Sequence, residues 1–222
     1  MFRLWMWQEL FAHFDIFLSG FAKTILISVL ALLLTFAIGI LVGLLRVSGK
    51  KAVKTICQGY ISFFQNTPLV VQVFFFYNVL PRLGIMLSPF ILGCISLGLY
   101  TGAFAASIVE AAIQAVPIGQ MEAAASQGFP FLTAMRLIIL PQALKIAMPP
   151  MANQSVNLIK NSSVLALIAG GELMYRSDSF AADASIYGPT FIVVGVLYLI
   201  ICLPLSTYAR NMEERLKKGA AK

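Results

Sequence analysis

Residues 20–45 read GFAKTILISVLALLLTFAIGILVGLL, and this stretch decides the fold. Lys23 is its one charged residue, and it contains no proline. A helix needs about 20 mostly apolar residues to cross the hydrocarbon core of a bilayer. The stretch exceeds that length, so it predicts a transmembrane helix.

The composition of the whole chain agrees with this prediction. Of its 222 residues, 59% are hydrophobic and 11% are charged, and the mean hydropathy is +0.87. A soluble domain carries about 25% charged residues, so this chain has too few to cover a water-exposed surface. The three cysteines are far apart in apolar surroundings and have no metal-site spacing. We therefore predict an all-α integral membrane protein with no metal site.

Hydropathy, together with the positions of glycine and proline, predicts about five transmembrane helices. They cover residues 20–45, 57–80, 89–116, 131–160 and 189–208. Pro68 lies inside the second and Pro141, Pro149 and Pro150 lie inside the fourth, which is tolerated where neighbouring helices or water satisfy the freed carbonyl groups. Residues 1–19 are rich in Trp and Phe and predict an interfacial helix. Residues 161–188 predict a half-helix followed by an external loop.

Lysine and arginine positions predict the orientation, because these residues concentrate in cytoplasmic loops. Arg46, Lys50, Lys51 and Lys54 follow the first helix, and the tail at residues 209–222 is also basic. With five spans both segments lie on one side, so the C-terminus is cytoplasmic and the N-terminus is outside. The loop at residues 117–130 is then cytoplasmic as well. The formal net charge of +7 is placed beside the spans, so we predict no nucleic-acid partner.

That cytoplasmic loop holds the most specific motif. Glu122, Ala123, Ala124 and Gly128 are followed by Ile138, Leu140 and Pro141. The pattern EAA-x3-G-x9-I-x-LP resembles the loop motif of permease subunits of ABC importers. The resemblance implies one permease domain over residues 1–222, with a type I importer fold. It also implies that Glu122, Ala123, Ala124 and Gly128 belong to a loop that docks on an ATPase subunit.

The residues of this loop are compatible with such a role. Residues 120–127 are good helix formers, Glu122 is expected in the first turn, and Gly128 is expected to end the helix in a left-handed conformation. The alternative is a surface helix that only joins two spans.

A narrower resemblance covers most of the chain. The stretches FFQNTPLVVQVFFFY and NLIKNSSVLALIAGGEL are similar to the polar amino-acid branch of these permeases, the histidine, glutamine and glutamate type. Three positions depart from that branch. Gln65 stands where an arginine is usual, and Ser107 and Glu110 replace the usual pattern of the third span. We expect Glu110 to be solvated or to face a partner.

Polar residues inside a membrane span are costly and therefore mark candidate functional sites. The densest group lies at the end of the fourth span. The candidates for the substrate pathway are Asn157, Lys160, Asn161, Ser162 and Ser163, with Asn66, Thr67 and Tyr100 from neighbouring spans. Asn161 to Ser163 are expected at a break in the helix, where free backbone donors could bind a carboxylate. Adhesion between helices is the alternative. The role of Glu172 stays open.

No phosphate-binding loop of the G-x-x-x-x-G-K-[ST] type is present. The resemblance implies that ATP and magnesium bind to a separate ATPase subunit and that this chain binds no cofactor. It further implies a second permease copy or a paralogue, an extracytoplasmic amino-acid-binding protein and a location in the bacterial cytoplasmic (inner) membrane. We therefore predict an importer subunit that works by alternating access on polar amino acids, with acidic or amide types favoured. An ion-coupled secondary transporter is the alternative, although the sequence has no inverted repeat and no mid-membrane carboxylate pair.

Overall fold

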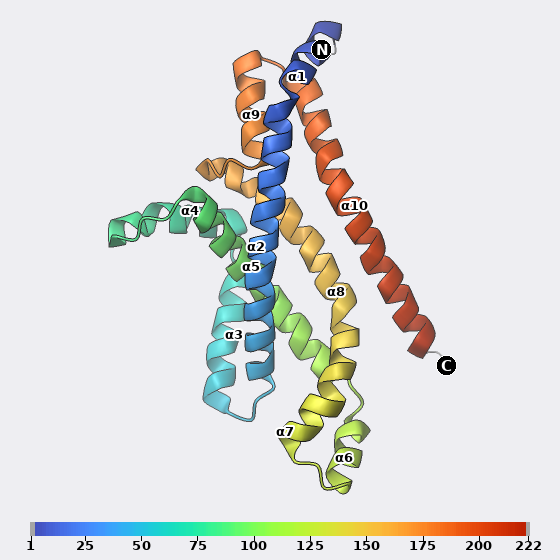
Figure 1. Cartoon of the computed structure of the whole chain (residues 1–222). Coiled ribbons are helices and arrows are strands. Elements are labelled where there is room, and N and C mark those ends of the chain that lie inside the picture. Colours follow the sequence, from blue (N-terminus) through green and yellow to red (C-terminus); the bar gives the residue numbers. More distant parts are fainter. Residues whose placement is uncertain (1–2, 221–222) are drawn as a thin grey trace.

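The computed structural model describes residues 3–220, and all regular structure among them is helical (Figure 1). The main helices are α1 (Leu4–Ala12), α2 (Phe14–Arg46), α3 (Lys51–Asn66), α4 (Leu69–Val79), α5 (Pro89–Gln114), α6 (Ile118–Ser126), α7 (Phe131–Ala134), α8 (Leu140–Asn161), α9 (Leu173–Ala184) and α10 (Tyr187–Ala220). Three short segments are helical but not α-helical. They are the 3₁₀-helical η1 (Pro81–Leu83), the π-helical η2 (Met135–Ile139) and the 3₁₀-helical η3 (Ser162–Ile168). The prediction of an all-α membrane protein is confirmed.

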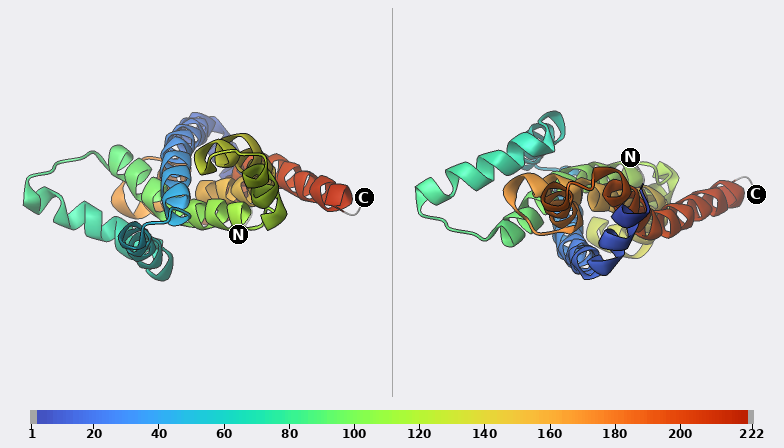
Figure 2. Two further views of the ribbon diagram at one scale, coloured as in Figure 1. Left: turned by 90° about the horizontal axis from the view of Figure 1, so that it is seen from below. Right: turned by 90° about the horizontal axis from the view of Figure 1, so that it is seen from above.

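Within the described residues, 4 helical segments are long and apolar enough to span a bilayer: Phe14–Arg46, Pro89–Gln114, Phe131–Ile168 and Tyr187–Leu216. The expected span at residues 57–80 is not one continuous helix. It is divided at Thr67 and Pro68, whose backbones are extended, into α3 and α4. Proline lacks the backbone N–H of a helix and disfavours helical geometry in the residue before it. Figures 1 and 2 show α4 projecting to one side of the bundle.

The N-terminal boundary also differs from the expectation. Residues 14–19, which we assigned to the interfacial segment, form the first turns of α2. The chain bends at His13, between α1 and α2. Phe17 is fully buried, and its ring packs edge-on against Phe180 of α9 at 5.4 Å. This tertiary contact favours an early start of α2, because burial of an aromatic ring is strongly stabilising.

The core of the bundle is the pairing of α2 with α5. Small residues let the two backbones approach closely, as is typical of membrane helices. A Cβ added at Gly39 would lie 2.5 Å from the Cβ of Ala105, and one added at Gly43 would lie 2.6 Å from the Cβ of Val109. Ile27 of α2 and Leu97 of α5 are fully buried in the adjoining cluster. Helices α3, α4 and α8 pack against α5, and α9 packs against α2.

Two groups of elements lie at opposite ends of the molecule. Figure 1 places the N-terminus, α1 and α9 at one end, and the α2–α3 turn, α6 and α7 at the other. The elements expected in the cytoplasm at the α2–α3 turn and in residues 117–130 therefore share an end. Their direction across the membrane stays a prediction.

Candidate functional site

A polar groove with a volume of about 370 Å³ lies between α5 and α8. Its lining consists of Tyr100, Thr101 and Phe104 from α5 and Gln154, Asn157, Lys160 and Asn161 from α8. The residues on each helix recur at spacings of three and four, so each helix contributes one face. Polar side chains gathered inside a membrane segment typically mark a solute path. We call this feature the polar groove.

The polar groove is positively charged. No carboxylate lies within ion-pair distance of Lys160 in residues 3–220, and none lines the groove. Asn157 donates its Nδ2 to Oε1 of Gln154 at 2.9 Å. This bond leaves the carbonyl oxygen of Asn157 available as an acceptor.

These groups match the chemistry of a free amino acid. An ammonium such as that of Lys160 binds a carboxylate, and amide carbonyl oxygens accept from a substrate ammonium. Tyr100 and Phe104 add an aromatic wall, with ring centroids 5.2 Å apart. Cations and aliphatic groups both pack favourably on aromatic faces.

Of the eight residues expected along the substrate pathway, four line the groove: Tyr100, Asn157, Lys160 and Asn161. Asn66 and Thr67 lie elsewhere, at the end of α3. Their side chains donate to the backbone carbonyl groups of Ser62 and Phe63 at 2.8 Å each. Both residues therefore serve the local turn before Pro68 in this structure.

Ser162 and Ser163 are also outside the groove lining. The helix does not break at these residues, because α8 continues directly into η3, and the backbone N–H of Ser162 is already bonded to carbonyl groups of the preceding turn. The hydroxyl of Ser162 is fully buried and donates to the Ile159 carbonyl at 2.7 Å. Serine hydroxyls commonly bond back to the preceding turn of a helix. The expected break lies further on, where Ala169 has φ 55° and Gly171 has φ 71°.

Three lining residues were missed as candidates, namely Thr101, Phe104 and Gln154. Phe104 follows Tyr100 by four residues and Thr101 by three, so Phe104 shares a side of α5 with each of them. Gln154 precedes Asn157 by three residues. Helical spacing from the residues that were chosen could have identified Phe104 and Gln154, but not Thr101, which follows Tyr100 by a single residue.

The motif loop forms α6, which projects from the bundle beside α7 (Figure 1). Glu122 and Ala123 are exposed, whereas Ala124 is buried. Large apolar side chains are uncovered close by, with Ile118 77% and Leu132 77% exposed. An exposed apolar patch of this kind is typical of a protein–protein contact.

Local geometry explains Gly128 of the motif and corrects the expected position of Glu122. Gly128 has φ 82°, and the N–H groups of Gly128 and Phe129 donate to Ala125 and Ala124 at 2.9 and 3.0 Å. These bonds form a Schellman cap, which requires the left-handed conformation that glycine adopts most easily. Glu122 lies beyond the first turn, contrary to our expectation, because α6 begins at Ile118, directly after Pro117.

Glu172, whose role the sequence left open, begins α9. It is fully buried, and its carboxylate oxygens accept from the N–H groups of Met174 and Tyr175 at 2.7 and 2.8 Å. Tyr198 of α10 donates its hydroxyl to the same carboxylate at 3.2 Å. Burial raises the pKa of the Glu172 carboxyl, and these hydrogen bonds counteract the rise. Glu172 therefore joins α9 to α10.

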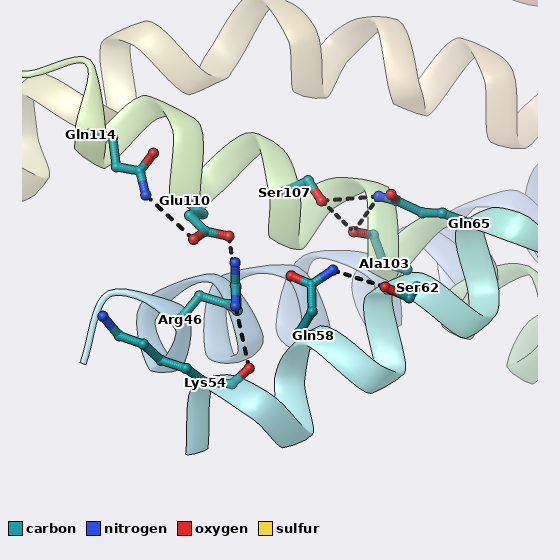
Figure 3. A network of polar contacts seen from close by, with 9 residues as sticks. All are labelled: Arg46, Lys54, Gln58, Ser62, Gln65, Ala103, Ser107, Glu110 and Gln114. Atoms are coloured by element: carbon teal, nitrogen blue, oxygen red, sulfur yellow. Dashed lines mark hydrogen bonds and ion pairs between the residues drawn. The ribbon is translucent and has the colours of Figure 1, made fainter. Parts of the chain in front are cut away.

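Glu110, which we expected to be solvated or to face a partner, is largely shielded and is paired within the chain. It lies between α2 and α5, where Nε of Arg46 contacts its Oε2 at 2.8 Å (Figure 3). The side chains are only 20% and 16% exposed. Arg46 also donates its Nη1 to the carbonyl oxygen of Lys54 at 3.3 Å. The pair thus connects α2, α3 and α5.

Gln65 extends this connection between α3 and α5. Its Nε2 donates to the carbonyl oxygen of Ala103 at 3.1 Å and to Oγ of Ser107 at 3.0 Å (Figure 3). Gln65 and Ser107 are two positions at which the sequence departs from the branch it resembles. In this chain their side chains are hydrogen-bonded to each other.

Comparison with known proteins agrees with the fold and the motif. Residues 35–218 match the family described as binding-protein-dependent transport system inner membrane component. The chain is 42% identical over 210 residues to the probable glutamine ABC transporter permease protein GlnM of Bacillus subtilis (strain 168), covering 95% of this chain and 97% of the relative. It is 32% identical over 203 residues to the arginine transport system permease protein ArtQ of the same organism, covering 91% and 93%.

Solved structures show the same arrangement of helices. A crystal structure of an amino acid ABC transporter with histidines matches with a TM-score of 0.87 and 30% identity, covering 94% of this chain and 97% of that one. The MetNI methionine ABC transporter in an inward-facing conformation matches with a TM-score of 0.72 at 16% identity, covering 90% and 98%, which supports the fold alone. The chain belongs to the family of binding-protein-dependent transport system inner membrane components.

Proposed function

We propose that the chain is the membrane-spanning subunit of an ATP-driven importer of polar amino acids, and that the substrate passes through the polar groove. The observation that carries this proposal is the groove itself, since it gathers an ammonium, three side-chain amides and two aromatic rings between two membrane helices. These groups complement the carboxylate and the ammonium that every free amino acid carries.

The charge of the groove favours acidic or amide substrates. Lys160 attracts a carboxylate, and none of the lining residues is acidic. The side chain of lysine or arginine would bring a second cation beside Lys160 without a counter-ion, which is unfavourable in a site of low dielectric. The similarity to a probable glutamine permease supports this choice.

The chain works with partner subunits in this proposal. An ATPase docks on α6 through Glu122, Ala123, Ala124 and Gly128, and it binds the ATP and magnesium that this chain does not hold. An extracytoplasmic binding protein delivers the amino acid. Binding of either partner favours one of two states of the permease, which is the basis of alternating access.

A second copy of the chain or a paralogue completes the path. The polar groove has lining residues from two helices of one chain, and a neighbouring permease chain would supply its remaining wall. Two permease chains related by a two-fold axis would place such a wall against each groove.

Uptake by the purified importer in proteoliposomes tests the proposal. We expect uptake of labelled glutamine with ATP inside the vesicles and none with an ion gradient alone. Excess glutamine or glutamate should compete, whereas arginine at the same concentration should not. Uptake driven by an ion gradient without ATP would contradict the importer assignment. Competition by arginine alone would contradict the substrate class.

A further inference from the structure

A second groove, with a volume of about 450 Å³, lies where α2 ends and α3 begins. Its lining residues are Arg46, Lys51, Lys54, Thr55, Gln58, Gly59 and Ser62. All except Arg46 lie on one face of α3, since they recur at helical spacing. We call this feature the basic groove.

The positive charge of the basic groove is largely unbalanced. The sequence contains no aspartate or glutamate between Asp15 and Glu110. Four cations lie at this turn: Arg46, Lys50, Lys51 and Lys54. Glu110 pairs with Arg46, and four cations less one carboxylate leave three positive charges. A patch of this kind attracts an anion.

Arg46 is held in position at the edge of the groove. Its Nε donates to Glu110 at 2.8 Å and its Nη1 to the carbonyl oxygen of Lys54 at 3.3 Å (Figure 3). Its Nη2 donates to no group among residues 3–220. A guanidinium that is already oriented loses little freedom when it binds a phosphate, and its planar form suits phosphate oxygens.

The start of α3 adds further donors. Lys50 precedes the first turn without a side-chain cap, and no acidic residue lies in that turn. The first N–H groups of a helix carry a partial positive charge and attract anions. Lys51, in this first turn, lines the groove.

The position of the groove favours a lipid over a soluble anion. Arg46 is the last residue of the first membrane-spanning helix, which is the level expected for phospholipid headgroups. Ile56 and Phe63 are 74% and 56% exposed. They lie three and four residues from Gly59, so they flank the groove on the surface of α3. The groove therefore offers cations and polar groups with apolar side chains beside them.

We propose that the basic groove binds the phosphodiester headgroup of an anionic phospholipid, whose acyl chains lie against Ile56 and Phe63. Each lysine or arginine near an anionic membrane surface contributes to such binding, and the contribution falls with increasing salt. This site is separate from the polar groove, and it does not depend on which amino acid is transported.

Native mass spectrometry of the complete importer in detergent tests the site directly. The probes are dioleoylphosphatidylglycerol and dioleoylphosphatidylcholine, titrated separately onto delipidated complex. We expect tight retention of phosphatidylglycerol only. Lys51→Ala/Lys54→Ala should weaken its binding about 30-fold, at about 5-fold for each lysine. The matched control Arg210→Ala/Lys218→Ala removes the same charge from the exposed end of α10 and should retain the lipid.

Two further measurements keep the test decisive. Lys51→Arg/Lys54→Arg preserves the charge and should bind phosphatidylglycerol like the parent. Millimolar glycerol 3-phosphate should not displace the lipid, because it lacks the acyl chains. Equal binding of the two lipids, equal loss in the two alanine pairs, or displacement by glycerol 3-phosphate would each overturn the proposal. Because binding is measured without transport, a failed amino-acid assignment would leave this result intact.

Discussion

The two sides of α5 differ in both packing and polarity. Toward α2, small residues bring the backbones together, and Ala105 would contact any side chain added at Gly39. Toward α8, the same helix presents Tyr100, Thr101 and Phe104 to an open polar groove. One side of α5 is closely packed through small residues, and the other is polar and open.

The difference separates the requirements of folding from those of transport. Close packing against α2 fixes the position of α5, so that the groove side can remain unfilled. Polar groups inside a membrane protein are expensive unless water or a partner satisfies them. Changes on the α2 side should therefore act on stability, and changes on the α8 side should act on uptake.

The largest effect is expected for Gly39→Ala. The new Cβ would lie 2.5 Å from the Cβ of Ala105 and 3.2 Å from its backbone carbonyl carbon, so the two helices must move apart. Such overpacking costs about 1–3 kcal/mol of unfolding free energy. Thermal unfolding of the purified permease in detergent measures it.

Gly195→Ala is the matched control, because nothing lies within 4 Å of the Cβ it would add in α10. It should leave stability unchanged or raise it by up to about 1 kcal/mol, the gain in helix propensity. Equal stabilities of the two variants would show that the α2–α5 contact is not as tight as described.

A smaller loss of free energy is expected for Gly128→Ala. This variant tests the left-handed cap that ends α6, the helix that follows α5. The substitution meets no neighbour within 4 Å, but the φ of 82° is unfavourable for alanine. The strain is about 1–2 kcal/mol, which predicts roughly 5- to 30-fold weaker binding of the ATPase. Retention of the ATPase during affinity purification measures this effect.

Gly119→Ala serves as the comparison for Gly128→Ala. Its added Cβ also meets nothing within 4 Å, and Gly119 lies within α6 in a helical conformation. ATPase retention should equal that of the parent. Equal loss of the ATPase from both variants would contradict the prediction. It would indicate that ATPase binding depends on direct contact with the surface of α6 and not on the left-handed cap at Gly128.

The smallest effect is expected for Asn157→Ala, on the groove side. Loss of one hydrogen-bonding amide costs about 1 kcal/mol, so the concentration for half-maximal uptake should rise about 5-fold. Asn153→Ala is the control, since Asn153 is exposed on the same helix but does not line the groove. Identical uptake by the two variants would indicate that the substrate does not reach Asn157.

Features that depend on a few neighbouring residues were the most predictable from the sequence. The motif loop is helical and ends at Gly128 in the left-handed conformation, as expected, because a cap is a local structure. The break near Pro68 could have been recognised in the same way. A long apolar run concealed it, and residues 57–80 were assigned to one span.

Features that depend on tertiary contacts were only partly predictable. Asn157 and Lys160 were candidates from the sequence, but only the structure brings them into one groove with Tyr100 of α5. The position of Ser162 outside the groove lining was not foreseen, because the bond of its hydroxyl to its own helix appears only in the structure. The partner of Glu110 was missed because Arg46 is 64 residues away in the chain.

Replacement of Lys160 tests the central claim most directly. Lys160→Met keeps the length of the side chain but removes the charge that the polar groove offers to a carboxylate. Hydrogen bonds to charged groups contribute about 1.5–3 kcal/mol, so ATP-driven glutamine uptake should fall at least about 10-fold. Lys145→Met, at an exposed position of the same helix outside the groove, should transport like the parent. Equal uptake by the two variants, with equal amounts of assembled complex, would contradict the account of the groove as the substrate path.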